Sequence, residues 1–184
     1  NADRMLSREE TMYSEFLETE LSKITPVVNT SGSDSAMLDN TLEFLVMNGL
    51  PLPLAVMMTI PEPWINNQAM NQERKDFYQY YATMMEPWDG PASILFSDGD
   101  IMGAVLDRNG LRPSRYYVTK DDYLILSSEV GVLPIDESRI LSKDRLKPGK
   151  MLLVDTVAGR LIDDDELKTA YATKQPYGEW LDKN

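Results

Sequence analysis

The chain has 184 residues and a formal net charge of −12, and hydrophobic residues make up 42% of it. This length and composition are typical of a globular protein with a sizeable core, organised as one large domain. The negative charge argues against nonspecific binding to nucleic acid or to an anionic membrane surface. No apolar run is long enough to span a bilayer, and the first residues lack the pattern of a secretory signal, so we expect a cytoplasmic protein.

The sequence contains neither cysteine nor histidine. Without cysteine there is no disulfide, no thiolate nucleophile and no sulfur ligand. Without histidine, the usual general base near neutral pH and the commonest metal ligand are both missing. We therefore expect no metal site, and unaided acyl transfer would need Ser, Thr or Lys as its nucleophile.

Helical periodicity dominates residues 8–86. Apolar residues at helical spacing predict an amphipathic helix over residues 8–23, preceded by a capping box at residues 7–10 (SREE). A second helix is expected to have Asp34 or Ser35 as its N-cap, because Ser and Asp lead the preferences for that position.

Three further signals complete this helical part. Residues 48–49 (NG) are expected to end the second helix, since glycine commonly follows a helix C-terminus. Residues 54–60 lie between prolines and are almost wholly apolar, which predicts a short buried helix. Aromatic residues and methionines at helical spacing predict a fourth helix over residues 72–85, with these side chains in the core.

From residue 91 to residue 162 the pattern changes to alternation, which predicts three β-hairpins. Their strands are residues 92–96 with 101–106, 115–119 with 123–127, and 151–155 with 159–162. A final helix is expected over residues 163–173, where an initial acidic run complements the positive helix end. Four helices followed by mainly antiparallel strands, with this last helix, indicate an α+β fold.

Charge is concentrated on a turn within residues 103–118. The Asn-Gly pair at residues 109–110 separates two strand-like runs, and both residue types tolerate positive φ. Four charged residues lie within nine positions of one another: Asp107, Arg108, Arg112 and Arg115. Turn formation alone does not require them, so the segment is a candidate charged site.

Two interpretations of Ser33, Asp34 and Ser35 remain open. The residues could do no more than cap a helix. Alternatively, the helix N-terminus and Asp34 form a site for a small zwitterion, because the amides favour a carboxylate and Asp34 favours an ammonium group. The strand-end sequence at residues 127–129 (SSE) has no G-x-S-x-G elbow and no histidine to activate it, which argues against a serine hydrolase.

Several segments resemble the class II glutamine amidotransferase domain of the glutamate synthase large chain. They are, in the same order, residues 33–45 (SDSAMLDNTLEFL), 85–92 (MEPWDGPA), 103–113 (GAVLDRNGLRP), 127–133 (SSEVGVL) and 146–155 (LKPGKMLLVD). The resemblance covers nearly all of residues 27–171. The string at residues 86–92 is particular to the glutamate synthase branch, whereas Ser-Asp-Ser and Asp-x-x-Gly-x-Arg-Pro are shared more widely among class II amidotransferases.

This resemblance implies an N-terminal-nucleophile hydrolase fold, an αββα sandwich of antiparallel sheets. In such domains an N-terminal cysteine attacks the glutamine side-chain amide, with its own α-amino group as base. The aspartate of the Ser-Asp-Ser element binds the substrate ammonium, which implies that role for Asp34, supported by Ser33 and Ser35. The resemblance implies structural roles beside the site for a second set: Asp107, Arg108, Asn109, Gly110, Arg112 and Glu129.

The family's cysteine, its substrate arginine and its oxyanion-hole segment lie upstream of the matching part. The chain thus resembles the C-terminal portion of the domain, with residues 1–184 forming a partial domain that we expect to be inactive alone. Whether another chain supplies the missing part, or truncation has removed it, stays open. The alternatives are a non-catalytic glutamine- or glutamate-binding module and part of another class II amidotransferase, against which residues 86–92 argue.

The parent enzyme implied by the resemblance makes glutamate from glutamine and 2-oxoglutarate. It would use FMN and an iron–sulfur cluster, with FAD and NADPH or with ferredoxin as the electron source, none of them bound by this fragment. Its partners would be the remainder of the glutamate synthase chain and either a small subunit or ferredoxin. The location implied is the cytoplasm, or the plastid of a photosynthetic eukaryote.

Overall fold

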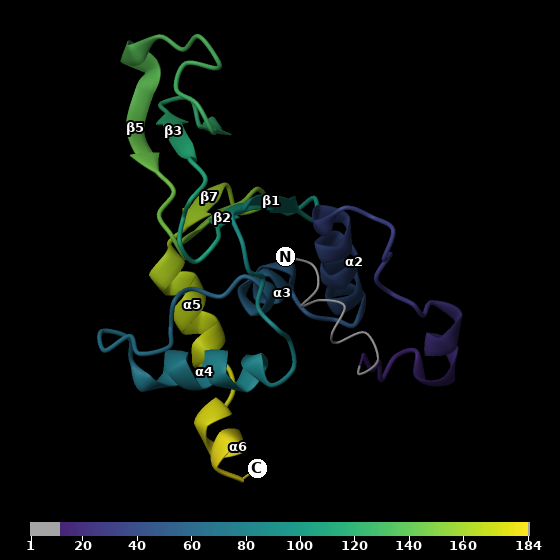
Figure 1. Cartoon of the computed structure of the whole chain (residues 1–184). Coiled ribbons are helices and arrows are strands. Elements are labelled where there is room, and N and C mark those ends of the chain that lie inside the picture. Colours follow the sequence, from purple (N-terminus) through teal and green to yellow (C-terminus); the bar gives the residue numbers. More distant parts are fainter. Residues whose placement is uncertain (1–11, 184) are drawn as a thin grey trace. The chain divides into compact units, whose positions relative to one another are not determined.

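The computed structural model describes residues 12–183 (Figure 1). These residues form two compact units. One unit comprises the described residues up to Gly90 together with those from Asp165, and it is helical. The other, Pro91–Asp164, contains the strands. None of the helices in the described part combines the length and the hydropathy needed to cross a lipid bilayer.

The start of the helical unit differs from the prediction for residues 8–23. The expected capping box lies outside the described residues, and residues 12–23 form turns followed by a 3-10 helix, η2 (Glu18–Lys23), instead of an α-helix. Glu18 has a φ of 40°, in the left-handed region, which interrupts a regular α-helix at that point. Phe16 is 75% exposed, so the expected apolar face is not buried here.

Helix α2 (Asp34–Met47) has Ser33 as its N-cap. Ser33 has extended backbone, and its Oγ accepts a hydrogen bond from the Ala36 amide at 3.3 Å. The prediction that Asp34 or Ser35 caps the helix is therefore wrong, because both residues already lie within the helical turn that Ser33 closes.

The predicted helix at residues 54–60 is confirmed as α3 (Leu52–Thr59), which starts two residues earlier. Pro53 lies in its first turn, where a missing amide proton costs nothing. All residues from Pro53 to Thr59 are buried, as the apolar sequence predicts. Before it, Gly49 has a φ of 87° and follows the C-terminus of α2, as expected.

Helix α4 (Gln72–Ala82) is three residues shorter than predicted, and Met84 beyond it is 46% exposed. Helix α5 (Asp164–Ala172) is close to the predicted last helix, but α6 (Tyr177–Lys183) was not predicted. An aromatic cluster holds α6 against α4, with ring centroids 4.9–5.6 Å apart: Phe77, Tyr80, Tyr81, Tyr177 and Trp180. Burial raises the pKa of Tyr81 far above its ordinary value, so its hydroxyl group stays protonated.

The second unit contains two antiparallel sheets, which confirms the α+β class and the three predicted hairpins. The four-stranded sheet has the order β1 (Ser93–Ser97), β2 (Ile101–Leu106), β6 (Met151–Asp155), β7 (Arg160–Ile162). The three-stranded sheet has the order β4 (Leu124–Ser127), β3 (Arg115–Thr119), β5 (Ile140–Arg145). Strand β5, which follows the 3-10 helix η3 (Glu137–Arg139), was not predicted.

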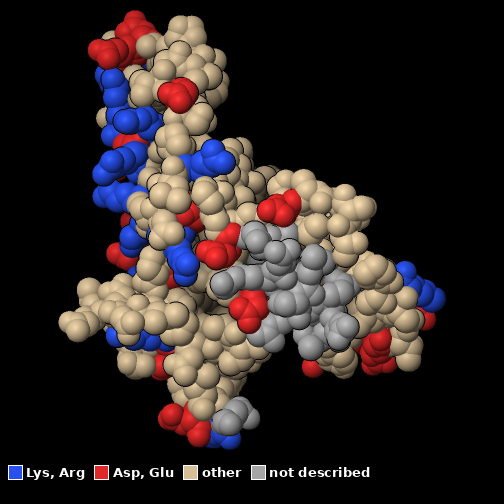
Figure 2. Space-filling view, viewed as in Figure 1, with Lys and Arg blue, Asp and Glu red and all other residues tan. Residues whose placement is uncertain are grey.

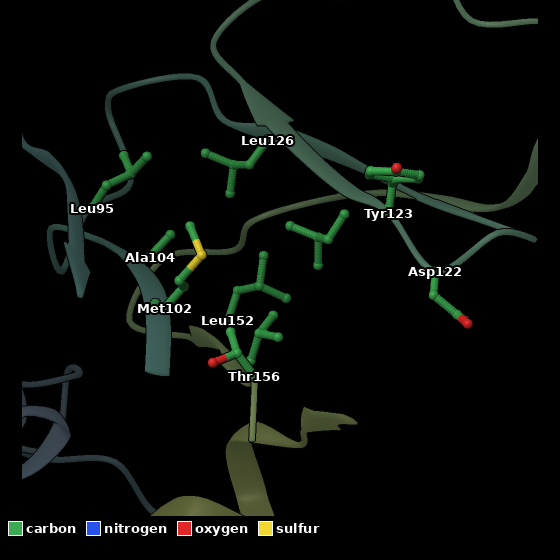
Figure 3. A pocket seen from close by; sticks show the side chains of 11 residues that line it. Leu95, Met102, Ala104, Asp122, Tyr123, Leu126, Leu152 and Thr156 are labelled. Carbon is green, nitrogen blue, oxygen red and sulfur yellow. The ribbon is translucent and has the colours of Figure 1, made fainter. Parts of the chain in front are cut away.

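The two sheets of this unit share a small core. Side chains of Ala104 and Leu152 from the four-stranded sheet belong to one buried cluster with Leu106 and Leu146, and Leu126 of the other sheet packs against it. The cluster continues into an apolar pocket of about 260 Å³. Figure 3 shows the side chains of Leu95, Met102 and Leu126 pointing toward one another across it. Opposing apolar faces therefore join the sheets.

The opposite face of the three-stranded sheet is basic. The register places Arg115 opposite Arg145 and Tyr117 opposite Lys143, whose Nζ lies 5.9 Å from the Tyr117 ring centroid. In Figure 2 the Lys and Arg side chains gather along β3 and β5, although the whole chain is acidic. This sheet thus has one apolar face and one charged face, as expected for an antiparallel sheet.

Candidate functional site

The residues predicted to bind substrate lie together at the N-terminus of α2. Ser33, Asp34 and Ser35 are all exposed, and the Oγ atoms of Ser33 and Ser35 lie 3.0 Å apart. Asp34 is the first helical residue, and its carboxylate has no hydrogen-bond or ion-pair partner among residues 12–183. A helix N-terminus favours nearby negative charge, so a carboxylate is well placed at this exposed position.

The loop before α2 is held by Asn29. Its Oδ1 accepts hydrogen bonds from the amide and the hydroxyl of Ser31, at 3.1 and 2.7 Å. The backbone amide of Asn29 donates a hydrogen bond to Asn40 Oδ1 at 3.0 Å, which fixes the loop to the body of the helix. A Cβ added to Gly32 would lie 3.2 Å from both Ala36 Cβ and the Asn29 carbonyl oxygen. The glycine therefore allows the loop to pass close to the first turn of the helix. This support for the loop was not predicted from the sequence.

Replacing Ser33 with Ala should lower the free energy of unfolding of the helical unit by about 1 kcal/mol, because the Ala36 amide loses its cap. Urea denaturation followed by tryptophan fluorescence measures this. Ser35→Ala is the matched control, since Ser35 is exposed in the same turn and does not cap. Equal stability of Ser33→Ala and the wild type would show that the Ser33 hydroxyl does not stabilise the helix.

Asp107, the first residue of the charged turn, is buried with 3% of its surface exposed. Its Oδ1 accepts from the Ala92 amide at 3.0 Å, and its Oδ2 accepts from the amides of Asn109 and Gly110 at 3.0 and 3.1 Å. The Asp107 amide in turn donates to the Ala92 carbonyl at 3.1 Å. The carboxylate thus closes the turn after β2 and fixes the chain entering β1.

Gly110 completes this turn. Its φ is 61°, and an added Cβ would lie 2.4 Å from Pro148 Cγ. Both the backbone conformation and the close approach of Pro148 therefore require glycine. Arg108 and Asn109 are exposed at the turn.

The other predicted positions in this unit lie elsewhere. Arg112 is exposed and lines a cavity beside the end of β4, where Ser127 and Ser128 also lie. The side chain of Glu129 is exposed, and its carbonyl oxygen accepts a hydrogen bond from Ser127 Oγ. The Asp107 turn and Arg112 belong to the β unit, and Asp34 belongs to the helical unit.

A buried ionic network was not predicted. Lys168 has only 2% of its side chain exposed, and its Nζ lies 3.2 Å from Glu62 Oε2. Tyr78 donates its hydroxyl proton to Glu62 Oε1 at 3.0 Å. Arg74 Nη1 lies 3.8 Å from Glu62 Oε1 and 3.1 Å from Asp165 Oδ1. The network ties α4 and α5 to the loop between α3 and α4.

The described residues contain no group of three or more acidic side chains placed to hold a metal ion. The sequence profile of the class II glutamine amidotransferases matches residues 1–180. The chain belongs to this family. Class II glutamine amidotransferases have the N-terminal-nucleophile hydrolase fold, and the antiparallel sheets and helices of the structure agree with it.

Individual relatives show which members of this family are similar to the chain. The chain is 53% identical to the large chain of an NADPH glutamate synthase from Bacillus subtilis, and 49% identical to an NADH glutamate synthase from Saccharomyces cerevisiae, over its whole length in both cases. It is 46% identical to ferredoxin-dependent glutamate synthase 2 from Synechocystis, over 98% of its length. It spans 12%, 8% and 12% of these proteins, respectively.

Proposed function

We propose that this chain is part of the glutamine-hydrolysing domain of a glutamate synthase large chain. The observation that carries the proposal is identity of 46–53% to three glutamate synthases over at least 98% of the chain. The three relatives are named for NADPH, NADH and ferredoxin, yet each is similar to the chain over almost all of its length. This similarity supports a step that does not depend on the electron donor, such as ammonia release from glutamine.

Asp34 is the residue we assign to the α-ammonium group of glutamine. Its exposed carboxylate lacks a partner within the described part of the chain, so an incoming cation need not displace one. Ser33 and Ser35 support the same turn, and the positive end of α2 favours the substrate α-carboxylate. An ammonium and a carboxylate on one carbon atom match this pair of opposite charges.

The nucleophile of the proposed reaction lies outside the chain, because the chain has no cysteine. We therefore infer that the 184 residues alone do not hydrolyse glutamine, and that the cysteine, the substrate arginine and the oxyanion hole come from other parts of the full-length protein. The same absence means that this chain offers no thiolate to an iron–sulfur cluster. We assign the cluster, FMN and the electron donor to the remaining domains or partner subunits.

In the full-length protein, Asp34→Asn should raise the KM for glutamine by roughly 10- to 100-fold, because a charge-assisted hydrogen bond to the ammonium group is lost. Glutamate formation from added ammonia should stay unchanged, since it bypasses glutamine. Steady-state rates with each nitrogen donor measure both effects. Asp39→Asn, an exposed carboxylate on the same helix, is the matched control. An unchanged KM in Asp34→Asn would contradict the assignment.

The lack of cysteine also favours a second candidate, a glutamine-binding module without catalysis. Ammonia release by the full-length protein separates the two, because only the glutaminase liberates ammonia from glutamine. A location in the cytoplasm or plastid remains a prediction, and relatives from rice and Arabidopsis are named as chloroplastic.

A further inference from the structure

The three-stranded sheet of the β unit turns a basic face away from the core. Tyr116 packs against the buried cluster, so its neighbours on β3, Arg115 and Tyr117, point to the opposite side. The register pairs these two residues with Arg145 and Lys143 of β5, and the paired positions on this face include no Asp or Glu. Figure 2 shows the Lys and Arg side chains gathered along the two strands. The face is therefore positively charged on a chain that is acidic as a whole.

Two arginines on this face lie directly opposite each other, Arg115 on β3 and Arg145 on β5. Like charges at such positions destabilise a sheet. Both side chains are exposed, and neither forms an ion pair or a hydrogen bond with a residue in the range 12–183. Protection of a sheet edge against aggregation accounts for a charge on the edge strand β5, but not for Arg115 on the central strand β3. The arginine pair thus opposes folding, as expected of residues that serve binding.

Strand β5 also has an open edge. The strand order β4-β3-β5 leaves its outer side without a neighbouring strand in the described part of the chain, and five of its six residues are exposed. An open edge presents backbone amide and carbonyl groups, to which an extended peptide can add as a further strand. Alternate side chains of an added strand would lie on the same face as Lys143 and Arg145, about 4.5–5.5 Å from them.

The present partner of Lys143 does not prevent such a contact. Lys143 Nζ lies 3.0 Å from Glu137 Oε1, but 51% and 85% of the two side chains are exposed. Exposed ion pairs contribute little to stability, so another carboxylate can replace Glu137 at low cost. Tyr117 lies beside this pair, with its ring centroid 5.9 Å from Lys143 Nζ. Because arginine and tyrosine are enriched among the residues that carry binding energy at protein interfaces, the composition of this face suits a protein partner.

We propose that the basic face and the open edge of β5 bind an extended acidic segment of a partner protein. The segment adds to β5 as a strand and presents carboxylates at alternate positions to Lys143 and to the arginine pair, whose mutual repulsion it relieves. A peptide fits better than a nucleic acid, because only a peptide completes the backbone hydrogen bonds of β5, and the net charge of −12 repels a polyphosphate. The surface is independent of the proposed glutamine site, which lies in the helical unit.

Fluorescence anisotropy of a labelled peptide in which Glu and Thr alternate tests this surface on the full-length protein. Saturating glutamine and 2-oxoglutarate are present, so that sites for these substrates cannot take up the glutamate side chains of the probe. Wild type should bind the peptide, and Arg115→Glu and Arg145→Glu should each weaken binding roughly 10- to 100-fold, since an attractive charge becomes a repulsive one. Lys174→Glu, the same change at an exposed position of the helical unit, is the matched control and should alter binding less than about twofold.

Thermal denaturation separates binding from stability. Arg115→Glu replaces a repulsive pair across β3 and β5 with an attractive one, so the melting temperature should stay unchanged or rise, whereas a structural role for Arg115 would lower it. A peptide with N-methylated backbone amides, which cannot pair as a strand, should bind at least roughly tenfold more weakly than the unmodified peptide. Absence of peptide binding, or affinities that coincide for wild type, Arg115→Glu and Arg145→Glu, would overturn the proposal. So would an N-methylated peptide, or an oligothymidylate of equal length, that binds as tightly as the unmodified peptide.

Discussion

Glu62→Gln is expected to lower the free energy of unfolding of the helical unit by about 3–5 kcal/mol, the usual cost of removing one partner from a buried ion pair. The substitution removes the carboxylate 3.2 Å from Lys168 Nζ and leaves the ammonium group in a position where 2% of its side chain is exposed. Trp64 stacks on Tyr78, which donates to Glu62, so tryptophan fluorescence during urea denaturation reports this unit directly.

Two further variants test the cause of this loss of stability. Adding Lys168→Met to Glu62→Gln should recover at least half of the lost stability, because the buried ammonium group that has lost the Glu62 carboxylate is then absent and the methionine side chain fills similar space. Glu43→Gln, an exposed carboxylate on α2, should change the free energy of unfolding by less than about 0.5 kcal/mol. If the double variant is no more stable than Glu62→Gln, loss of the Glu62 carboxylate beside the buried Lys168 ammonium group is not the cause.

This network also shows where prediction from sequence ends. Glu62 and Lys168 are far apart in the chain, and no local pattern relates a residue between two prolines to one face of a late helix. The three hairpins, by contrast, follow from turn residues placed between alternating runs, and α3 follows from an apolar stretch between prolines. In both cases short-range sequence determines the element, so the prediction succeeds.

The missed elements depend on distant partners. Strand β5 is mostly polar and exposed, and its extended conformation comes from pairing with β3 rather than from its own apolar pattern. Helix α6 is short, and its aromatic side chains pack against α4, nearly a hundred positions earlier in the chain. Conversely, residues 12–23 have helical spacing but no buried face, and propensity alone rarely sustains a short helix.

For the candidate sites, sequence patterns located the residues but not their surroundings. Ser33, Asp34 and Ser35 were correctly placed at a helix start, although the cap moved to Ser33 because backbone conformation decides which hydroxyl faces the amides. The sequence identified Asp107 only as one of four charged residues near a turn. Its carboxylate points inward instead, and only three-dimensional structure reveals that three amides surround it.

Because this carboxylate points inward, we expect Asp107→Ala to lower the free energy of unfolding of the β unit by about 2–4 kcal/mol. The Ala92 amide loses its side-chain acceptor in a buried position, and the amides of Asn109 and Gly110 lose theirs at the turn. All three tryptophans, Trp64, Trp88 and Trp180, lie in the helical unit, so hydrogen exchange of these amides is the better measurement. Exchange at Ala92 should become roughly 30- to 700-fold faster, since each factor of ten corresponds to about 1.4 kcal/mol.

Asp98→Ala separates the effect of burial from that of turn chemistry. Asp98 also accepts two amide protons, those of Asp100 and Ile101 at 3.0 and 2.9 Å, but it lies exposed in the turn between β1 and β2. Water can replace the lost acceptor there, so the expected loss is below about 1 kcal/mol. Similar losses for both variants would mean that the number of hydrogen bonds, and not their burial, determines how strongly Asp107 stabilises the turn beside β1. A much larger loss for Asp107→Ala would assign the stabilisation to an acceptor that solvent cannot reach.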